Sequence, residues 1–349
     1  MKNLVEQAST WLRSEECNKG SILERTAAVE MKYREYLKDE KDEICSNTGL
    51  SYPLILSNIE LLETSINKIQ TNFLHGKQQE ALQETYKMMG SMKFDMLFEG
   101  TPLYKCRENE RLYHYSKDEM FHIPYEKRHL VRNQRFSLSG IPCLYLGGSS
   151  YICWEELGRK DFNTSNYCGY SLKEPVDMFD MMLPTAIINE HQLRKVLLIL
   201  VCSQTANREH IFKPEYILPQ CVLHSLIQRT YDNHKPICVR YYSSHFLKGD
   251  ADYFEHDYEE KTLQRYVNYV FPAASTEDNG YSNELRKVFN QTETISPMRE
   301  NLRNPSNFID SISEDPYVNS HFGLIDSILD EKLGFKSKRT KITVVVDGS

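Results

Sequence analysis

Residues 121–157 read FHIPYEKRHLVRNQRFSLSGIPCLYLGGSSYICWEEL, and this stretch decides the fold. It predicts a strand at 143–146 and a helix at about 152–157, for which Ser149 and Ser150 are candidate N-caps. Gly147, at the junction, allows the backbone to approach a ligand closely, and amides at a helix start favour anions. The junction therefore predicts a site for an anionic ligand.

Working outward, residues 100–279 mix short apolar runs with helical segments in irregular order. Such an order predicts an α+β domain rather than a regular βαβ repeat. There is no GxGxxG or GxxxxGK[ST] motif, so neither a Rossmann dinucleotide site nor a P-loop is supported. The expected strands are 103–106, 143–146, 196–202, 239–242 and 268–271, and the expected helices are 152–157 and 219–228.

The first 99 residues predict a helical N-terminal domain. Ile55, Ile59, Leu62, Ile66, Ile69 and Phe73 form one apolar stripe at helical spacing. Gly76 breaks the pattern, and a second helix from 78 to 92 is expected to fold back as a hairpin. We interpret the stripe as core packing, with a partner or dimer contact as the alternative. Residues 280–349 are polar and predict a C-terminal extension.

Composition excludes several classes of protein. Of the 349 residues, 40% are hydrophobic and 26% charged, which is ordinary for a globular protein. The net charge of −7 argues against a nucleic-acid partner. The N-terminus lacks a signal-peptide pattern, and the longest apolar run, 196–202, is too short to span a membrane. Nine scattered cysteines without a CxxC pair predict reduced thiols in a cytoplasmic protein, and no His or Cys spacing predicts a metal site.

The stretch 121–157 resembles the longer branch of the RES-domain family. Later pieces match that family in order: Tyr216-Ile-Leu-Pro-Gln220, Val239-Arg-Tyr-Tyr-Ser243 and Asn268-Tyr-Val-Phe-Pro272. The resemblance covers roughly residues 100–275. It implies mixed sheets of the ADP-ribosyltransferase type, breakdown of NAD⁺ or transfer of its ADP-ribose, and a toxin whose expected partner is a cognate antitoxin protein.

The family is named for an Arg, a Glu and a Ser. By the resemblance, the Glu falls on Glu156, eleven residues after Tyr145, with Glu155 as its close neighbour. The Ser falls on Ser243, although Ser244 follows it directly. These positions imply that Glu156 stabilises an oxocarbenium-like ribose, as carboxylates do in glycoside hydrolysis. Ser243 would bond a ribose hydroxyl or the nicotinamide amide, and Tyr145 would pack on that end of the substrate.

The family's Arg has two candidates, because this chain reads Leu103-Tyr-Lys-Cys-Arg107 where the family has Leu-Tyr-Arg-x-Arg. Arg107 matches the second basic position, and Lys105 replaces arginine at the first. Alternation along a strand puts both side chains on one face. Arg107 and Arg135 would hold the pyrophosphate, since a planar guanidinium binds phosphate better than a point charge does.

The sequence thus predicts an enzyme that takes NAD⁺ as its substrate, cleaves the nicotinamide–ribose bond and needs no metal. Phosphorolysis and hydrolysis both remain open. One alternative is a protein mono-ADP-ribosyltransferase. The other is a non-catalytic module that senses NAD⁺ or docks a partner, which the lysine at position 105 keeps open. Homo-oligomerisation is left open as well.

Overall fold

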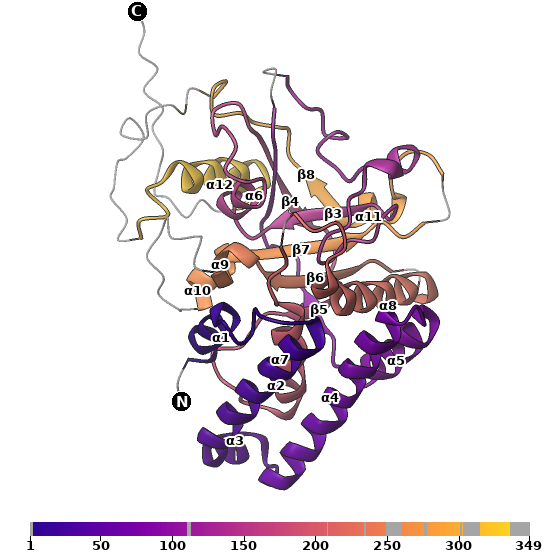
Figure 1. The fold of residues 1–349 in the computed structure, drawn as a ribbon. Coiled ribbons are helices and arrows are strands. Elements are labelled where there is room, and N and C mark those ends of the chain that lie inside the picture. The colour runs from indigo at the N-terminus through magenta and orange to yellow at the C-terminus, as the bar shows by residue number, and fades with distance from the viewer. Residues whose placement is uncertain are drawn as a thin grey trace, which may run out of the picture.

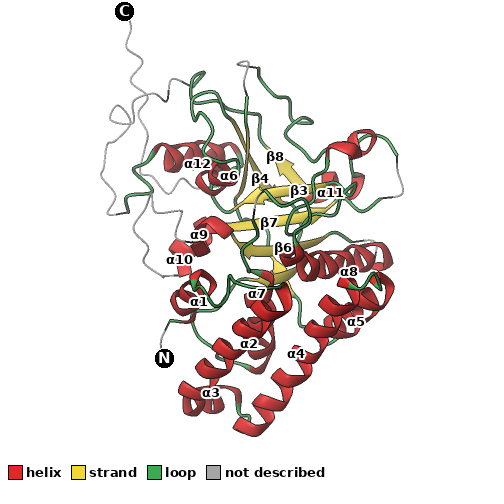
Figure 2. Cartoon of the chain, viewed as in Figure 1, coloured by secondary structure: helices red, strands yellow, loops and turns green. Residues whose placement is uncertain are grey.

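The computed structural model describes residues 3–109, 113–207, 209–233, 235–248, 260–275, 278–300, 302 and 315–335. The chain is of the α+β class, as predicted, with 48% helix and 15% strand. Helices form a thick layer on one side of a central sheet, and further helices lie at the opposite end (Figures 1 and 2).

The sheet has eight strands in the order β1-β5-β6-β7-β3-β2-β4-β8. Only β5 and β6 pair in parallel; the other described pairs are antiparallel. A parallel pair needs a long crossover, and here the chain makes it through two helices, α7 and α8. The strands are β1 Asp95–Leu97, β2 Leu103–Arg107, β3 Cys143–Gly147, β4 Asn166–Leu172, β5 Val176–Met181, β6 Ile237–Tyr242, β7 Val267–Pro272 and β8 Phe289–Gln291.

Most of the expected elements are confirmed. The strand predictions at 103–106, 143–146, 239–242 and 268–271 correspond to β2, β3, β6 and β7. The predicted helices correspond to α6, Ser150–Glu156, and α8, Ile217–Asn233. The remaining helical elements of this region are η1 Tyr125–Leu130, η2 Pro214–Tyr216, α9 Ser244–Lys248, α10 Glu260–Leu263, η3 Gln264–Tyr266, α11 Asn283–Val288 and α12 His321–Lys332.

The strand predicted at 196–202 is wrong, because these residues end helix α7, Glu190–Cys202. Asn189 begins the helix by accepting a hydrogen bond from the amide of Gln192 at 3.0 Å. Every residue from 196 to 202 is buried, since α2 and α4 pack against α7. A helix buried all round shows no polar face, so its period is hidden in the sequence.

The N-terminal helices confirm the predicted stripe and hairpin. Helix α4, Tyr52–Leu74, buries Ile55, Ile59, Leu62, Ile66 and Ile69, and α5, Gln78–Gly90, folds back along it. Gly76, between them, has a φ of +77°, which suits glycine. The preceding helices are α1 Leu4–Arg13, α2 Ile22–Asp39 and α3 Lys41–Thr48.

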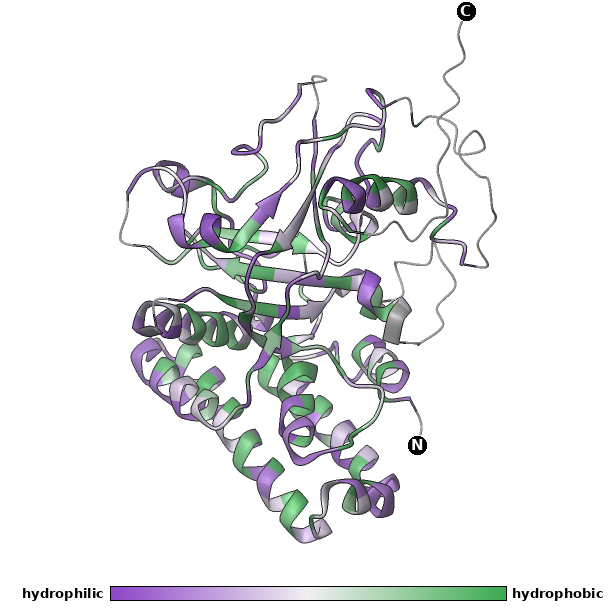
Figure 3. Cartoon of the chain, turned by 180° about the vertical axis from the view of Figure 1, so that it is seen from behind, coloured by the Kyte–Doolittle hydropathy of each residue, from purple (hydrophilic) through white to green (hydrophobic). Residues whose placement is uncertain are grey.

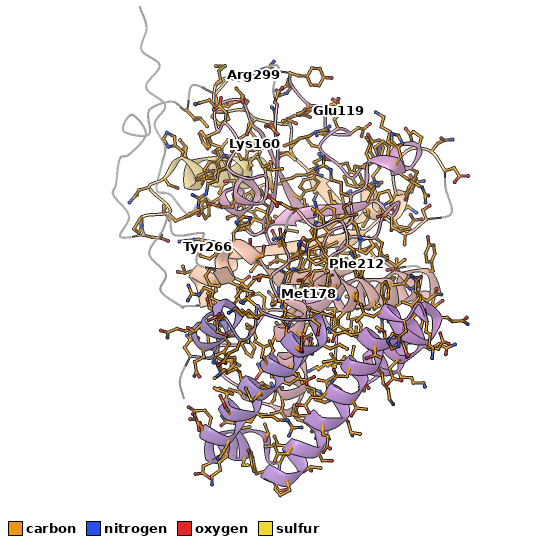
Figure 4. All side chains as sticks on the ribbon, viewed as in Figure 1. Glu119, Lys160, Met178, Phe212, Tyr266 and Arg299 are labelled. Carbon is orange, nitrogen blue, oxygen red and sulfur yellow. The ribbon has the colours of Figure 1, made fainter. Side chains whose placement is uncertain are left out.

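These helices share one hydrophobic core with the sheet. Met178 of β5, labelled in Figure 4, is 3% exposed and belongs to the same cluster as the stripe on α4. The hydroxyl of Tyr33 in α2 donates to the carbonyl of Leu193 at 2.7 Å. Figure 3, from behind, shows green and purple alternating along these helices and green segments in the central strands. Core packing is therefore the role of the stripe.

The sheet crosses both predicted domain boundaries. Strand β1 precedes residue 100, and β8 and α12 follow residue 279. The division into 1–99, 100–279 and 280–349 stays a prediction, but the described parts of all three segments contribute to one sheet or its cover. All nine cysteines are free thiols. Within the described ranges, no helix combines the length and apolarity needed to cross a membrane.

Candidate active site

The site lies where three neighbouring strands meet α6. Gly147, the last residue of β3, pairs with Asn268 of β7, which pairs in turn with Tyr241 of β6. Directly opposed residues project from the same face of a sheet. Helix α6 packs on this face, because a β-carbon on Gly147 would lie 2.6 Å from atoms of Ile152 and Cys153. The last residue of α6 is Glu156.

The carboxylate of Glu156 is held by two neutral donors. Ser243 donates from Oγ to Oε1 at 2.5 Å, and Asn268 donates from Nδ2 to the same oxygen at 2.7 Å. Glu156 is itself exposed. Within the described part of the chain, Oε2 has no hydrogen-bond donor and the carboxylate has no ion-pair partner. One oxygen is thus fixed, while the other lacks a partner among the described residues of this exposed side chain.

Ser243 is fully buried, and its hydroxyl group donates its hydrogen bond to Glu156. Its Oγ also accepts from the amide of His245 at 3.2 Å, and its own amide donates to the carbonyl of Tyr266 at 2.9 Å. Tyr266, labelled in Figure 4, stacks on α9 through Phe246, with 4.7 Å between ring centroids. In this arrangement Ser243 orients the carboxylate instead of offering a donor to a ligand.

The structure distinguishes the two neighbouring glutamates. Glu155 is 1% exposed, and both of its oxygens accept from Arg159 Nε at 3.0 Å. Its charge is therefore neutralised within the protein. Ser244, the alternative to Ser243, is the first residue of α9, and Ser243 is the serine that bonds Glu156.

Aromatic side chains extend the same face of the sheet. Tyr145 projects alongside Gly147, and Tyr241 projects alongside Asn268. The Tyr145 hydroxyl donates to the carbonyl of Phe136 at 3.3 Å, and the Phe136 ring lies 4.6 Å from that of Tyr241. Burial raises the pKa of Tyr241, and the Glu156 carboxylate adds to the rise. Tyr241 thus lies within electrostatic range of Glu156.

Arg135 lies close to the aromatic wall that Tyr145, Phe136 and Tyr241 form. Its guanidinium donates to the carbonyls of Cys202 at 2.8 Å and Gln204 at 3.2 Å, at the end of α7. Its positive charge lowers the pKa of Tyr241, against the larger effect of burial. The segment that carries Arg135 is also held by Gln220 of α8, whose Nε2 donates to the carbonyl of Gln134 at 2.8 Å. Arg135 is therefore a fixed cation beside the tyrosine that neighbours Glu156.

Lys105 and Arg107 lie on the other face of the sheet. Tyr104 pairs with Gly147, so its neighbour Lys105 projects away from α6, and Arg107 does the same two residues on. Lys105 donates to the carbonyl of Phe121 at 2.6 Å, and burial lowers its pKa to about 8. Arg107 is exposed and lies 4.2 Å from the ring centroid of Tyr115. The predicted strand alternation is confirmed, but these cations do not meet Glu156.

Gly147 serves close packing of the helix. Because Ile152 and Cys153 fill the space in front of its α-carbon, no ligand approaches from that side in this arrangement. Ser149 caps α6, as predicted, by accepting from the amide of Ile152 at 3.1 Å. Two cavities lie away from Glu156: one of about 520 Å³ between α2 and α4, and one of about 370 Å³ beside Asp180 and Arg240. The described residues contain no cluster suited to a metal ion.

Sequence reasoning missed two members of the site, Asn268 and Tyr241. Asn268 is a polar residue near the start of the otherwise apolar strand β7, and Tyr241 precedes Ser243 by two positions. Both lie in segments that carry the resemblance. A polar side chain that opens a buried strand was the available signal, since it needs a partner there.

A search of characterised proteins finds a relative in Bacillus subtilis (strain 168) named "Putative toxin YopC". The two are 32% identical over 202 residues, which is 52% of this chain and 43% of the relative. The chain thus spans less than half of that relative's length. No model of a known protein family matches the chain, and no solved structure matches it significantly.

Proposed function

We propose that this chain is a RES-type toxin that breaks the nicotinamide–ribose bond of NAD⁺. One observation carries the proposal: the bond from Ser243 to Glu156, which joins residues 87 positions apart. The family resemblance singles out these two positions from sequence motifs alone. That the fold brings them into direct contact supports the resemblance, and with it an ADP-ribosyltransferase-like arrangement of the sheet.

In this proposal Glu156 is the catalytic carboxylate. As nicotinamide leaves, the ribose gains positive charge, and a fixed carboxylate lowers the energy of that transition state. The two bonds to Oε1 hold the group in one orientation, so Oε2 is available to the ribose or to the incoming nucleophile. Ser243 and Asn268 are positioning residues, because they act through Glu156.

The substrate would lie along the aromatic wall. Tyr145 and Tyr241 offer ring faces to the nicotinamide end. Arg135 would meet the pyrophosphate, since its fork has five N–H donors and two of them are engaged with carbonyls. Lys105 and Arg107 lie beyond the sheet from this wall, so Arg135 is the first choice for the phosphates. No metal is needed, because the leaving group is already a pyridinium.

The direct test is the loss of NAD⁺ in the presence of the purified chain, with and without inorganic phosphate, with nicotinamide and the ribosyl product resolved. Release of nicotinamide by the wild type and not by Glu156→Gln would support the proposal. A requirement for phosphate would identify phosphorolysis. Transfer of ADP-ribose from labelled NAD⁺ to a protein would favour mono-ADP-ribosylation. Intact NAD⁺ at high protein concentration would reject the enzymatic proposal and leave the NAD⁺-sensing or partner-docking alternative.

A further inference from the structure

Helix α12 covers the helix that carries Glu156. It lies against α6 and β4, next to α6 in Figures 1 and 2. The ring of Phe322 in α12 is 5.3 Å from that of Tyr151 and 5.2 Å from that of Trp154, between centroids. The resemblance ends near residue 275, so α12 lies outside it and has no role in the function proposed above.

A carboxylate of α12 binds the start of α6. Asp326 Oδ1 accepts from the backbone amide of Ser150 at 3.0 Å, and Oδ2 accepts from the hydroxyl of Tyr317. Ser150 also donates its hydroxyl to the carbonyl of Phe322 at 3.2 Å. Asp326 is 9% exposed. It therefore satisfies a first-turn amide of α6 that the helix itself leaves unpaired.

We infer that Asp326 is a positioning residue for Glu156: by holding the first residue of α6, it fixes the placement of the last. The inference rests on the proposed function only in so far as Glu156 is catalytic. Helix α6 has seven residues, Ser150 to Glu156, and spans about 10 Å at 1.5 Å per residue. A shift at its start therefore moves Glu156 relative to Ser243 and Asn268, which belong to other elements.

The same helix supplies a matched control. Asp330, one turn after Asp326, is 4% exposed and accepts from the hydroxyl of Tyr104 in β2 at 2.6 Å. It too is a buried carboxylate of α12 that contacts the sheet assembly. Asp330 thus accepts a hydrogen bond from a strand, whereas Asp326 accepts one from the first residue of α6. A purely structural role of α12 would make the two aspartates equivalent, and a positioning role would not.

The surroundings of Asp326 make its charge sensitive to pH near neutrality. The groups that face it are Asp330 on its own helix, Tyr317, Tyr104 of β2, and Cys153 of α6. Within the described residues it forms no ion pair, and burial raises its pKa to about 7. Its bonds are all accepted from N–H and O–H groups, so protonation removes an acceptor and loosens the contact with α6.

The experiment compares NAD⁺ turnover by Asp326→Asn, Tyr317→Phe and Asp330→Asn. We expect kcat to fall about 10- to 100-fold in Asp326→Asn with KM nearly unchanged, since misplacement of a catalytic group affects the chemical step. Tyr317→Phe, a milder change if the first variant folds poorly, should lower kcat less. The wild type should lose activity as the pH falls through about 7. Asp330→Asn should keep this limb at a lower pH, because the charge of Asp330 helps to raise the pKa of Asp326, and Asp326→Asn should lack the limb. Wild-type kcat and pH profile in Asp326→Asn would overturn the inference.

A second readout does not depend on activity. The chain has two tryptophans, so Trp11→Phe leaves Trp154 of α6, against Phe322, as the only reporter. Its fluorescence should titrate near pH 7, and the transition should vanish with Asp326→Asn but persist with Asp330→Asn. If NAD⁺ stays intact with the wild type, the proposed function fails, yet this titration still decides whether Asp326 holds α6. A transition unchanged by Asp326→Asn would contradict the inference.

Discussion

Ser243 and Glu156 are joined by a 2.5 Å hydrogen bond from the end of β6 to the end of α6. The serine is completely buried and the glutamate is exposed. A buried hydroxyl with one proton has one direction in which to donate, so it fixes the orientation of the carboxylate. Asn268 adds a second bond to the same oxygen. The pair is therefore a pre-oriented anion at the molecular surface.

Removal of the charge should abolish turnover without unfolding the protein. In Glu156→Gln the shape is kept, and the amide oxygen can still accept from Ser243 and Asn268. We expect NAD⁺ cleavage to fall at least about 100-fold, the typical loss on removal of one electrostatic stabiliser. Thermal unfolding should be unchanged. Glu60→Gln, which alters an exposed carboxylate on α4, is the surface control and should keep full activity; residual activity of Glu156→Gln near the wild-type level would exclude Glu156 as catalytic.

Glu155→Gln should behave in the opposite way. It breaks the ion pair between the buried Glu155 and the half-exposed Arg159, so we expect a loss of stability of about 1–3 kcal/mol with kcat largely retained once the protein is folded. Urea unfolding and turnover of the folded fraction measure the two effects. A loss of kcat in Glu155→Gln equal to that in Glu156→Gln would mean that the assignment of the two glutamates is wrong.

The two donors to Glu156 should act as a unit. Ser243→Ala and Asn268→Ala each remove one bond to Oε1, and each should lower kcat about tenfold with little change in KM, because the carboxylate stays but loses its fixed orientation. Since both act through one group, the double variant should lose less than the product of the single losses. Steady-state kinetics of the four proteins give the coupling. Strictly multiplicative losses would argue that the two residues act separately.

The sequence predicts those helices and strands that have one apolar and one polar face, because their residues then follow a clear period. The stripe on α4 and the capped start of α6 belong to this class, as does the shared face of Lys105 and Arg107 on β2. Helix α7 does not, because residues 196–202 are buried all round and a short apolar run fits either a strand or a helix. Strand β4 was missed for a related reason: it is buried along its whole length, and Gly169 and Ser171 interrupt its apolar pattern.

The motifs predict which residues belong to the site but not how these residues are placed relative to one another. Glu156 and Ser243 came from the resemblance, and their contact is a property of the fold. Which face of β2 carries Lys105 depends on the register of Tyr104 against Gly147, and no local pattern encodes that register. The cations could therefore be named from the sequence but not placed. The same limit applies to Asp326, whose partner Ser150 lies 176 residues away.

Gly147 should tolerate no side chain. In Gly147→Ala the new methyl group would lie 2.6 Å from Cys153 Sγ and from Ile152 Cγ2. Helix α6 must then move away from β3, at a cost of about 1–3 kcal/mol for overpacking, and Glu156 moves with it. Lower stability in urea unfolding should accompany lower kcat. Gly90→Ala, where nothing lies within 4 Å of the added carbon, is the control: it should keep the wild-type kcat and should not lower stability, since alanine favours the helical conformation more than glycine does.

Acid should destabilise the fold through His122. The ring is 2% exposed; Nε2 accepts from the amide of Ser282 at 2.8 Å, Nδ1 bonds the carbonyl of Ile123 at 2.7 Å, and burial lowers the pKa to about 4. The folded pKa is below the unfolded value of 6.5, so in acid the unfolded chain binds the proton more readily. The contribution of His122 to stability is therefore complete above pH 6.5 and is lost as the pH falls toward 4.

The test is the difference in unfolding free energy between the wild type and His122→Gln across this window. Glutamine can accept from Ser282 and donate to Ile123 but does not titrate, so the wild-type advantage should shrink by roughly 3 kcal/mol between pH 7 and pH 4. The difference is needed because Asp326 titrates in the opposite sense: its raised folded pKa lowers stability as the pH rises from about 4 to 7. His75→Gln, at an exposed ring, is the control and should show no such dependence. A difference for His122→Gln that stays constant with pH would show that the ring is not held neutral in the folded protein.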